Sequence, residues 1–132
     1  AENKTITIQC PPDLTAQMDQ KLIGRVLDNL ISNALKYTES QGKIQIIAQA
    51  KDNKTLITVR DDGPGVPDSY KEIIFGKYQQ APNAFDKPQR KGTGLGLAFC
   101  RLVVELHGGE IWVSDVADAK EGSDFNFSLL RN

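Results

Sequence analysis

The chain has 132 residues, of which 39% are hydrophobic and 25% are charged, and these values are typical of one globular domain with a buried core. The formal net charge of −1 predicts no general attraction to nucleic acid, and no apolar run approaches the roughly 20 residues of a membrane span, so we expect a domain that does not itself enter the membrane. Two cysteines and one histidine are too few for a Cys/His zinc site, and they favour reduced thiols in a cytoplasmic location.

The spacing of apolar residues predicts strands and helices in alternation. Residues 4–10 alternate as a strand does, whereas the apolar residues between Thr15 and Tyr37 recur at helical spacing. The segment from Gly76 to Lys91 has no period, which indicates a loop of a length that is usually functional or disordered. In chain order we expect strand 4–10, helix 15–37, strands 43–50 and 55–60, short helix 68–75, loop 76–91, helix 94–107, and strands 110–115 and 123–130.

This order predicts an α/β (α+β) two-layer sandwich, with a mixed β-sheet of about five strands and about three helices on one face. Residues 1–132 would form a single domain. In the helix 94–107, Leu102, Val103 and Leu106 are among the apolar residues of one side, and the pair Gly108–Gly109 is typical of a helix end.

Four polar residues share one face of the long predicted helix, at the border of its apolar stripe. Asn29, Asn33, Lys36 and Tyr37 follow the spacing i, i+4, i+7 and i+8, which places them within about a quarter-turn of one another. Asparagine is a poor residue for a helix interior, so two of them one turn apart indicate a use for their amides. An amide oxygen suits Mg²⁺ and a lysine suits a phosphate. A solvated polar face would give the same pattern.

Asp61 follows a predicted strand in the stretch "VRDDGPGVP", and Gly63 and Gly65 make the turn after it tight. A carboxylate held at a strand end can accept a hydrogen bond from an exocyclic amine such as that of adenine. A plain Asp-Gly turn explains the motif equally well when it is taken alone.

The stretch "KGTGLGL", residues 91–97, opens a predicted helix with glycines but is neither a dinucleotide fingerprint nor a P-loop. Free backbone N–H groups at a helix start still favour an anion. In the loop before it, four cations stand against the single acid Asp86, which adds positive charge. These features predict a phosphate site, and a glycine-rich hinge with solvated charges is the alternative.

Taken in order and spacing, the stretches "VLDNLISNALKYT", "DDGPG", "IIFGKYQQ" and "KGTGLGL" resemble the ATP-binding catalytic domain of bacterial-type sensor histidine kinases. That family lies within the wider group that includes gyrase, heat-shock chaperone ATPases and mismatch-repair ATPases. A weaker match, "EGSDF", has Ser123 where many members carry threonine. The resemblance covers essentially the whole chain and implies a Bergerat-type fold, with ATP bound under a flexible lid.

The resemblance also implies the roles of individual residues. Asn33 would ligate Mg²⁺, Asn29 would lie beside the phosphates, and Lys36 and Tyr37 would contact phosphate and the polar edge of the nucleotide. Asp61 would read the adenine amine, and Ser123 would assist through water. The remaining expected contacts are Gly63 and Gly65 at the base, Arg90 and Lys91 at the γ-phosphate, and the backbone of Gly92, Thr93, Gly94, Leu95, Gly96 and Leu97 around the phosphates.

One departure from the wider group bears on the reaction. Its ATPases and serine kinases carry a glutamate one turn before the metal-binding asparagine, whereas this chain has Asn29, which cannot act as a general base. Transfer to a histidine fits better, because an imidazole is already a nucleophile near neutral pH. His107 is not expected to be the acceptor, and a cation favoured by the end of its helix is the simpler interpretation.

We therefore expect the first step of two-component phosphorelay signalling. The domain would act as a monomer on a dimerisation and phosphoacceptor domain outside this chain, it would not autophosphorylate alone, and a response regulator would receive the phosphoryl group next. The alternative is a non-catalytic nucleotide-binding or interaction module, a pseudokinase.

Overall fold

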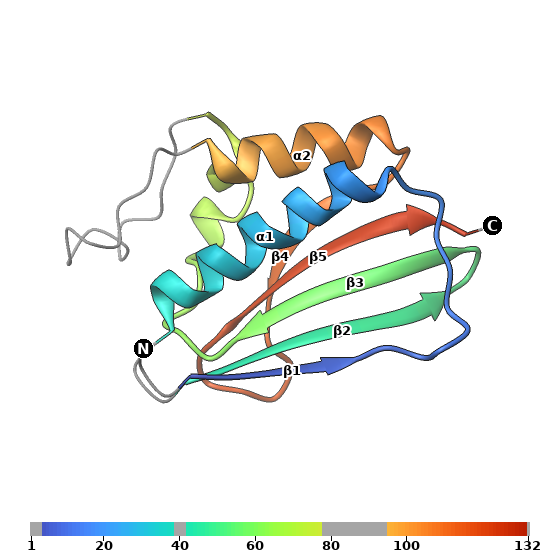
Figure 1. Ribbon diagram of the computed structural model, residues 1–132. Coiled ribbons are helices and arrows are strands. Elements are labelled where there is room, and N and C mark those ends of the chain that lie inside the picture. Colours follow the sequence, from blue (N-terminus) through green and yellow to red (C-terminus); the bar gives the residue numbers. More distant parts are fainter. Residues whose placement is uncertain (1–3, 39–41, 78–94, 132) are drawn as a thin grey trace.

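The computed structural model describes residues 4–38, 42–77 and 95–131. In these ranges five strands form one mixed sheet in the order β1-β2-β3-β5-β4, and two α-helices lie over one of its faces (Figure 1). β1 pairs with β2 in parallel, and the other neighbouring strands are antiparallel. The elements are β1 (Thr5–Gln9), α1 (Gln20–Tyr37), β2 (Lys43–Lys51), β3 (Lys54–Asp61), the 3₁₀ turns η1 (Asp68–Tyr70) and η2 (Ile73–Phe75), α2 (Gly96–Leu106), β4 (Ile111–Asp115) and β5 (Ser123–Leu130).

The predicted two-layer sandwich and its order of elements are confirmed, with two local differences. α1 begins at Gln20 and not near Thr15, because the Asp19 side chain accepts a hydrogen bond from the Leu22 N–H (3.1 Å) and caps the helix there. The segment 68–75, which was expected to be one short helix, forms η1 and η2, and neither of these turns has a side-chain cap.

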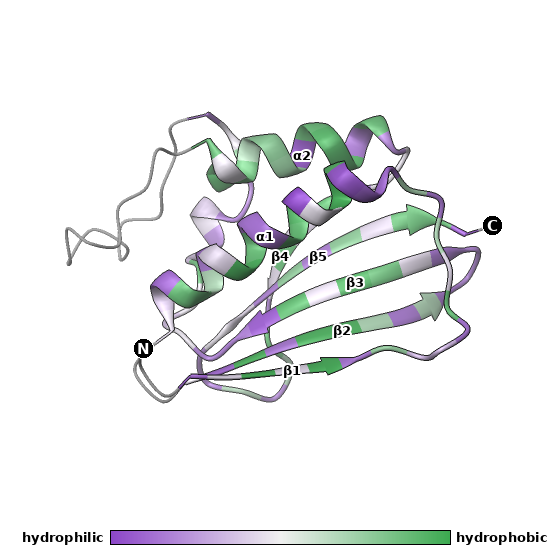
Figure 2. Ribbon diagram, viewed as in Figure 1, coloured by the Kyte–Doolittle hydropathy of each residue, from purple (hydrophilic) through white to green (hydrophobic). Residues whose placement is uncertain are grey.

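The core lies between the helices and the sheet. Along β5, Phe125, Phe127 and Leu129 point toward the helices and are at most 3% exposed, while the residues between them face the other side of the sheet. Figure 2 shows the same alternation of hydrophobic and hydrophilic residues along β3 and β5. Phe75 from η2 packs edge-to-face on Phe125, with 6.3 Å between the ring centroids. The sheet and the segment before residue 78 therefore share one core.

The buried side of α2 is narrower than its sequence suggests. Val103 and Val104 are buried, whereas Leu102 and Leu106 are 58% and 73% exposed. Leu102 and Leu106 therefore do not share a buried side with Val103. The buried side of α2 is centred instead on Cys100, Val103 and Val104. No helix in the described ranges is long and apolar enough to cross a membrane.

The connection from α2 to β4 depends on two glycines. Gly108 has a φ of +78°, the left-handed conformation that ends many helices, and the Gly109 N–H donates to the Val104 carbonyl (3.0 Å). A Cβ on Gly109 would lie 1.8 Å from the Ser128 carbonyl oxygen on β5. The chain can therefore pass from α2 to the edge strand β4 only with glycine at this position.

We expect Gly109→Ala to lower the free energy of unfolding by about 2–4 kcal/mol, since the new methyl group would collide with backbone that cannot move away. The matched control is Gly24→Ala inside α1, where a Cβ would meet nothing within 4 Å and should instead stabilise the helix by up to about 1 kcal/mol. Urea denaturation of both variants gives the comparison. Equal effects of the two substitutions would contradict this account of the α2–β4 connection.

Candidate functional site

The predicted site residues come from segments far apart in the sequence, and α1 brings two of these segments to its own surface. At its end, the Tyr37 carbonyl lies against Gly63, where an added Cβ would be 2.5 Å from the carbonyl oxygen. Two turns earlier Asn29 lies beside Gly96, the first residue of α2, where an added Cβ would be 3.3 Å from Asn29 Oδ1. The turn after β3 and the start of α2 therefore lie at two points along one helix.

Asp61 is the buried acid of this region. It ends β3, is 4% exposed, and pairs in the sheet with Ser123, the first residue of β5. Its Oδ1 accepts a hydrogen bond from the Gly63 N–H (2.9 Å). Burial raises the pKa of the Asp61 carboxyl from 3.8 to about 6, although the backbone hydrogen bonds from Gly63 and Ser123 act in the opposite direction. The result is a carboxylate that is ionised at neutral pH yet poorly solvated, and the two backbone N–H groups offset only part of the cost of burying its charge.

Gly122 belongs to this region, and the sequence analysis did not single it out. It has a φ of +110°, and a Cβ there would lie 2.6 Å from the Asp61 carbonyl oxygen. Gly65 (φ +85°) packs in turn against the Gly122 carbonyl, at 3.2 Å from an added Cβ. The sequence hint for Gly122 was its place directly before Ser123 in "EGSDF". That position lies next to Asp61 only because β5 pairs with β3. The glycines keep the backbone close around Asp61.

The other end of the region carries the two asparagine amides. Asn29 and Asn33 are half-buried on α1 and are separated by about 6 Å along the helix axis. The structure records no hydrogen bond from either side chain to another described residue. No group of three or more His, Cys, Asp or Glu side chains in the described ranges could hold a metal ion. The donor set therefore fits a cation such as Mg²⁺ that takes one or two protein oxygens and fills its other positions from phosphates and water.

The start of α2 adds an electropositive element beside Asn29. No side chain of the described residues caps this helix, and its first turn contains no acidic residue, so the backbone N–H groups there favour an anion. Leu97 is half-buried in the same turn, Leu95 precedes it, and Lys36 is exposed on α1. The expected contacts at Arg90, Lys91, Gly92, Thr93 and Gly94, and the expected flexible lid, lie outside the described residues.

His107 has a structural place away from this region, at the opposite end of α2. Its Nε2 accepts a hydrogen bond from the Asp19 N–H (3.0 Å), and its Nδ1 lies 2.8 Å from the Val103 carbonyl oxygen. The ring thus links the start of α1 to the last turn of α2.

The two ends of the region suit different chemistry. Eight residues separate Asn29 from Tyr37, which corresponds to about 12 Å along α1. One end offers a buried carboxylate acceptor surrounded by closely packed backbone, and the other offers amide oxygens and a helix N-terminus. A ligand with a hydrogen-bond donor on a flat ring and a chain of phosphates at the far end would match both.

Comparison with known proteins identifies the family. Residues 18–132 match the family of histidine kinase-, DNA gyrase B- and HSP90-like ATPases. The chain is 38% identical over 130 residues to the adaptive-response sensory kinase SasA of Synechocystis sp., covering 97% of this chain and 33% of that protein. It therefore spans about a third of the length of this relative.

Solved structures agree with the sequence matches. The catalytic domain of the histidine kinase ThkA superposes with a TM-score of 0.80 at 34% identity, over 98% of this chain and 80% of that one. ThkA in complex with the response regulator TrrA superposes with a TM-score of 0.74 at 30% identity, over 98% of this chain and 35% of that one.

The raised pKa of Asp61 predicts that its ionisation destabilises the fold. Because the folded state binds this proton more tightly than the unfolded chain, the contribution of Asp61 to stability is full below pH 3.8 and is lost as the pH rises through about 6. Asp61→Asn, which cannot ionise, should therefore raise the free energy of unfolding at pH 7.5 by up to about 3 kcal/mol. Urea denaturation at pH 7.5 and 4.5 measures this, and the gain over wild type should shrink at the lower pH. An equal gain at both would contradict the assignment.

Proposed function

Because the chain belongs to the histidine kinase-, DNA gyrase B- and HSP90-like ATPase family and is a catalytic domain of the histidine kinase type, we propose that it binds Mg²⁺-ATP and transfers the γ-phosphoryl group to a histidine of a separate domain. The observation that carries this proposal is the arrangement along α1. The buried acceptor Asp61 lies at one end of the region, and Asn29 lies beside the start of α2 at the other. This arrangement matches a nucleotide in extended form.

At the base end, Asp61 would accept a hydrogen bond from the exocyclic amine of adenine. Guanine has a carbonyl oxygen at that position, so an ionised Asp61 would discriminate against it through unfavourable acceptor–acceptor contact. Gly63, Gly65 and Gly122 would let the base lie close to the backbone, and Ser123 would act through a bridging water.

At the phosphate end, Asn33 would supply an oxygen to Mg²⁺, with Asn29 beside it. Lys36 and Tyr37, further along α1, would contact phosphate and the polar edge of the nucleotide. The backbone of residues 92–97 with the cations Arg90 and Lys91 would surround the phosphates from the side of α2. The bound ion would neutralise charge on the phosphates that moves during transfer.

The reaction class follows from the amide at Asn29. No carboxylate stands one turn before Asn33, so the domain has no side chain at this point to deprotonate water or a serine hydroxyl. A neutral imidazole attacks with the lone pair of its unprotonated nitrogen, so no base is needed before attack: the new N–P bond forms as the bond from the γ-phosphorus to the bridging oxygen breaks and ADP leaves. The other ring nitrogen then releases its proton to solvent. This domain would contribute positioning and charge neutralisation, and the partner domain would contribute the nucleophile.

The partners of the whole protein are part of the proposal. A dimerisation and phosphoacceptor domain would present the histidine, and a response regulator would take the phosphoryl group afterwards, as expected for two-component signalling. The naming of relatives as sensory kinases and the solved ThkA–TrrA complex support this arrangement.

The first test is nucleotide binding by isothermal titration calorimetry with ATP and GTP, with and without Mg²⁺. Wild type should prefer ATP and bind it more tightly with Mg²⁺. Asn33→Ala should weaken Mg²⁺-ATP binding by about tenfold or more, since it removes a metal ligand, and should lose most of the effect of Mg²⁺. The control Asn53→Ala, in the exposed turn between β2 and β3, should bind as wild type does. Failure of wild type to bind ATP would refute the proposal.

The second test is phosphoryl transfer. The domain is mixed with γ-labelled ATP and the separate phosphoacceptor domain of a sensor kinase relative. The label should appear on the acceptor as acid-labile, base-stable phosphohistidine, and the catalytic domain alone should stay unlabelled. Asn33→Ala should slow transfer, because it disturbs the metal site. Tight ATP binding without transfer to any of several acceptors would favour a non-catalytic nucleotide-binding module instead.

A further inference from the structure

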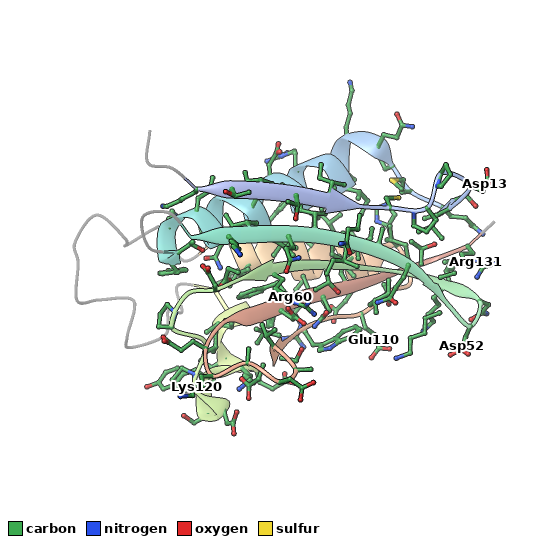
Figure 3. All side chains as sticks on the ribbon, turned by 90° about the horizontal axis from the view of Figure 1, so that it is seen from below. Asp13, Asp52, Arg60, Glu110, Lys120 and Arg131 are labelled. Carbon is green, nitrogen blue, oxygen red and sulfur yellow. The ribbon has the colours of Figure 1, made fainter. Side chains whose placement is uncertain are left out.

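The face of the sheet that points away from the helices carries an ion pair directly behind Asp61. Arg60 on β3 donates to Asp124 on β5 through two parallel hydrogen bonds, Nε to Oδ1 at 2.7 Å and Nη2 to Oδ2 at 3.0 Å. Figure 3 shows this face and labels Arg60 on it. Asp124 is 8% exposed, so the pair is largely shielded from water on one side. A bidentate pair of this kind fixes both the distance and the relative orientation of the two strands that carry it.

The place of this pair in the strand register links it to the base end of the site. Arg60 lies opposite Asp124, and the next pair along the same strands is Asp61 opposite Ser123. Successive residues of a strand point to opposite faces, so the ion pair lies on one face and the Asp61–Ser123 pair on the other. Arg60 and Asp124 therefore hold the same two stretches of backbone that present Asp61 and Ser123, without contacting the region where a base would lie.

Support at this point matters because both strands end there. β3 terminates at Asp61, and β5 begins at Ser123 directly after Gly122, which has a positive φ. Strand ends open more easily than strand centres. Asn126, two residues further along β5, also supports this point: its Nδ2 donates to the Asp124 carbonyl (3.1 Å) and to Ser114 Oγ (3.1 Å), and Ser114 lies opposite Asp124 on β4. Further from the strand end, the Glu110 N–H donates to Ser128 Oγ (3.1 Å).

We propose that Arg60 and Asp124 are positioning residues for base recognition, acting from the opposite face of the sheet to hold the backbone of Asp61 and Ser123 at the separation that adenine requires. The inference rests on the proposed nucleotide-binding function and deepens it at the base end. It predicts a specific pattern of loss: breaking the pair weakens the reading of the base and leaves the binding of phosphates at the far end of α1 intact.

The test uses three ligands and calorimetry on the folded domain with Mg²⁺ present. The Kd for ATP depends on contacts at both ends of the site, and its ratio to the Kd for GTP measures base preference. The Kd for inorganic tripolyphosphate measures contacts at the phosphate end alone. In Arg60→Gln and in Asp124→Asn, we expect the Kd for ATP to rise by about tenfold and the ATP-over-GTP preference to fall by a similar factor, while the Kd for tripolyphosphate stays at the wild-type value.

Two further variants separate positioning from plain stability. Arg60→Lys keeps the charge but not the planar two-point contact, so its loss of base preference should be intermediate. The double variant Arg60→Asp with Asp124→Arg restores a pair of opposite charges and should recover base preference relative to the single variants. Ser128→Ala is the matched control, because it breaks a hydrogen bond of the same face, from the Glu110 N–H, four residues along β5 from Asp124. It should lower the melting temperature and leave the ATP-over-GTP preference unchanged.

The outcomes are distinct. If Arg60→Gln and Asp124→Asn lower only the melting temperature, or weaken ATP and tripolyphosphate equally, the pair is a structural contact and the inference is overturned. If Ser128→Ala loses base preference as much as they do, general loosening of the sheet explains the effect and the inference is again overturned. If wild type itself does not prefer ATP over GTP, the proposed function fails and the inference fails with it.

Discussion

The buried carboxylate of Asp61 is the constraint around which the rest of the region is arranged. It ends a central strand at 4% exposure, and burial raises its pKa to about 6. An ionised group can remain there only because backbone N–H groups of Gly63 and Ser123 donate to it. Those donors are close because Gly63 and Gly122 have no side chains: a Cβ on either would collide with a backbone carbonyl. The glycines serve close approach here more than flexibility.

α1 sets the distance between this acid and the opposite end of the site. Its apolar side, with Val26, Leu30 and Ala34 buried, fixes the rotation of the helix on the sheet. The face that carries Asn29 and Asn33 is therefore held at the rim of the core, and the helix cannot turn it away without exposing the buried side. Tyr37 lies against Gly63 and Asn29 lies beside Gly96, and because both residues belong to α1, the helix fixes the distance between these two contacts. A ligand that engages both ends needs no large rearrangement of the sheet to do so.

In the proposed function, the two ends would match a nucleotide through different charges: a carboxylate at the base, and amides with a helix N-terminus at the phosphates. The base end places a poorly solvated negative charge where a donor would relieve it, at the expense of stability in the free protein. In the proposed function, the neutral amides and the helix N-terminus at the other end would hold phosphates and a metal ion together, without a fixed carboxylate that would repel the phosphates. The amide at Asn29 would then leave activation of the acceptor to the acceptor itself. An imidazole would meet that requirement, whereas water or a hydroxyl would not.

The sequence by itself determined the order of elements, the sandwich architecture and the grouping of Asn29 and Asn33 on one helix face, because these depend on spacing within a continuous segment. Tertiary structure decided what depends on the meeting of distant segments. The role of Gly122 depends on its packing against Asp61, and the role of Arg60 depends on the register that pairs it with Asp124 on β5. The role of His107 depends on a backbone N–H donor 88 residues away in the sequence. The burial of Asp61 likewise depends on the packing of distant segments against one another. Periodicity fixes the direction of a side chain relative to its own element, but only the pairing and packing of elements decide what that side chain meets and how much water remains around it.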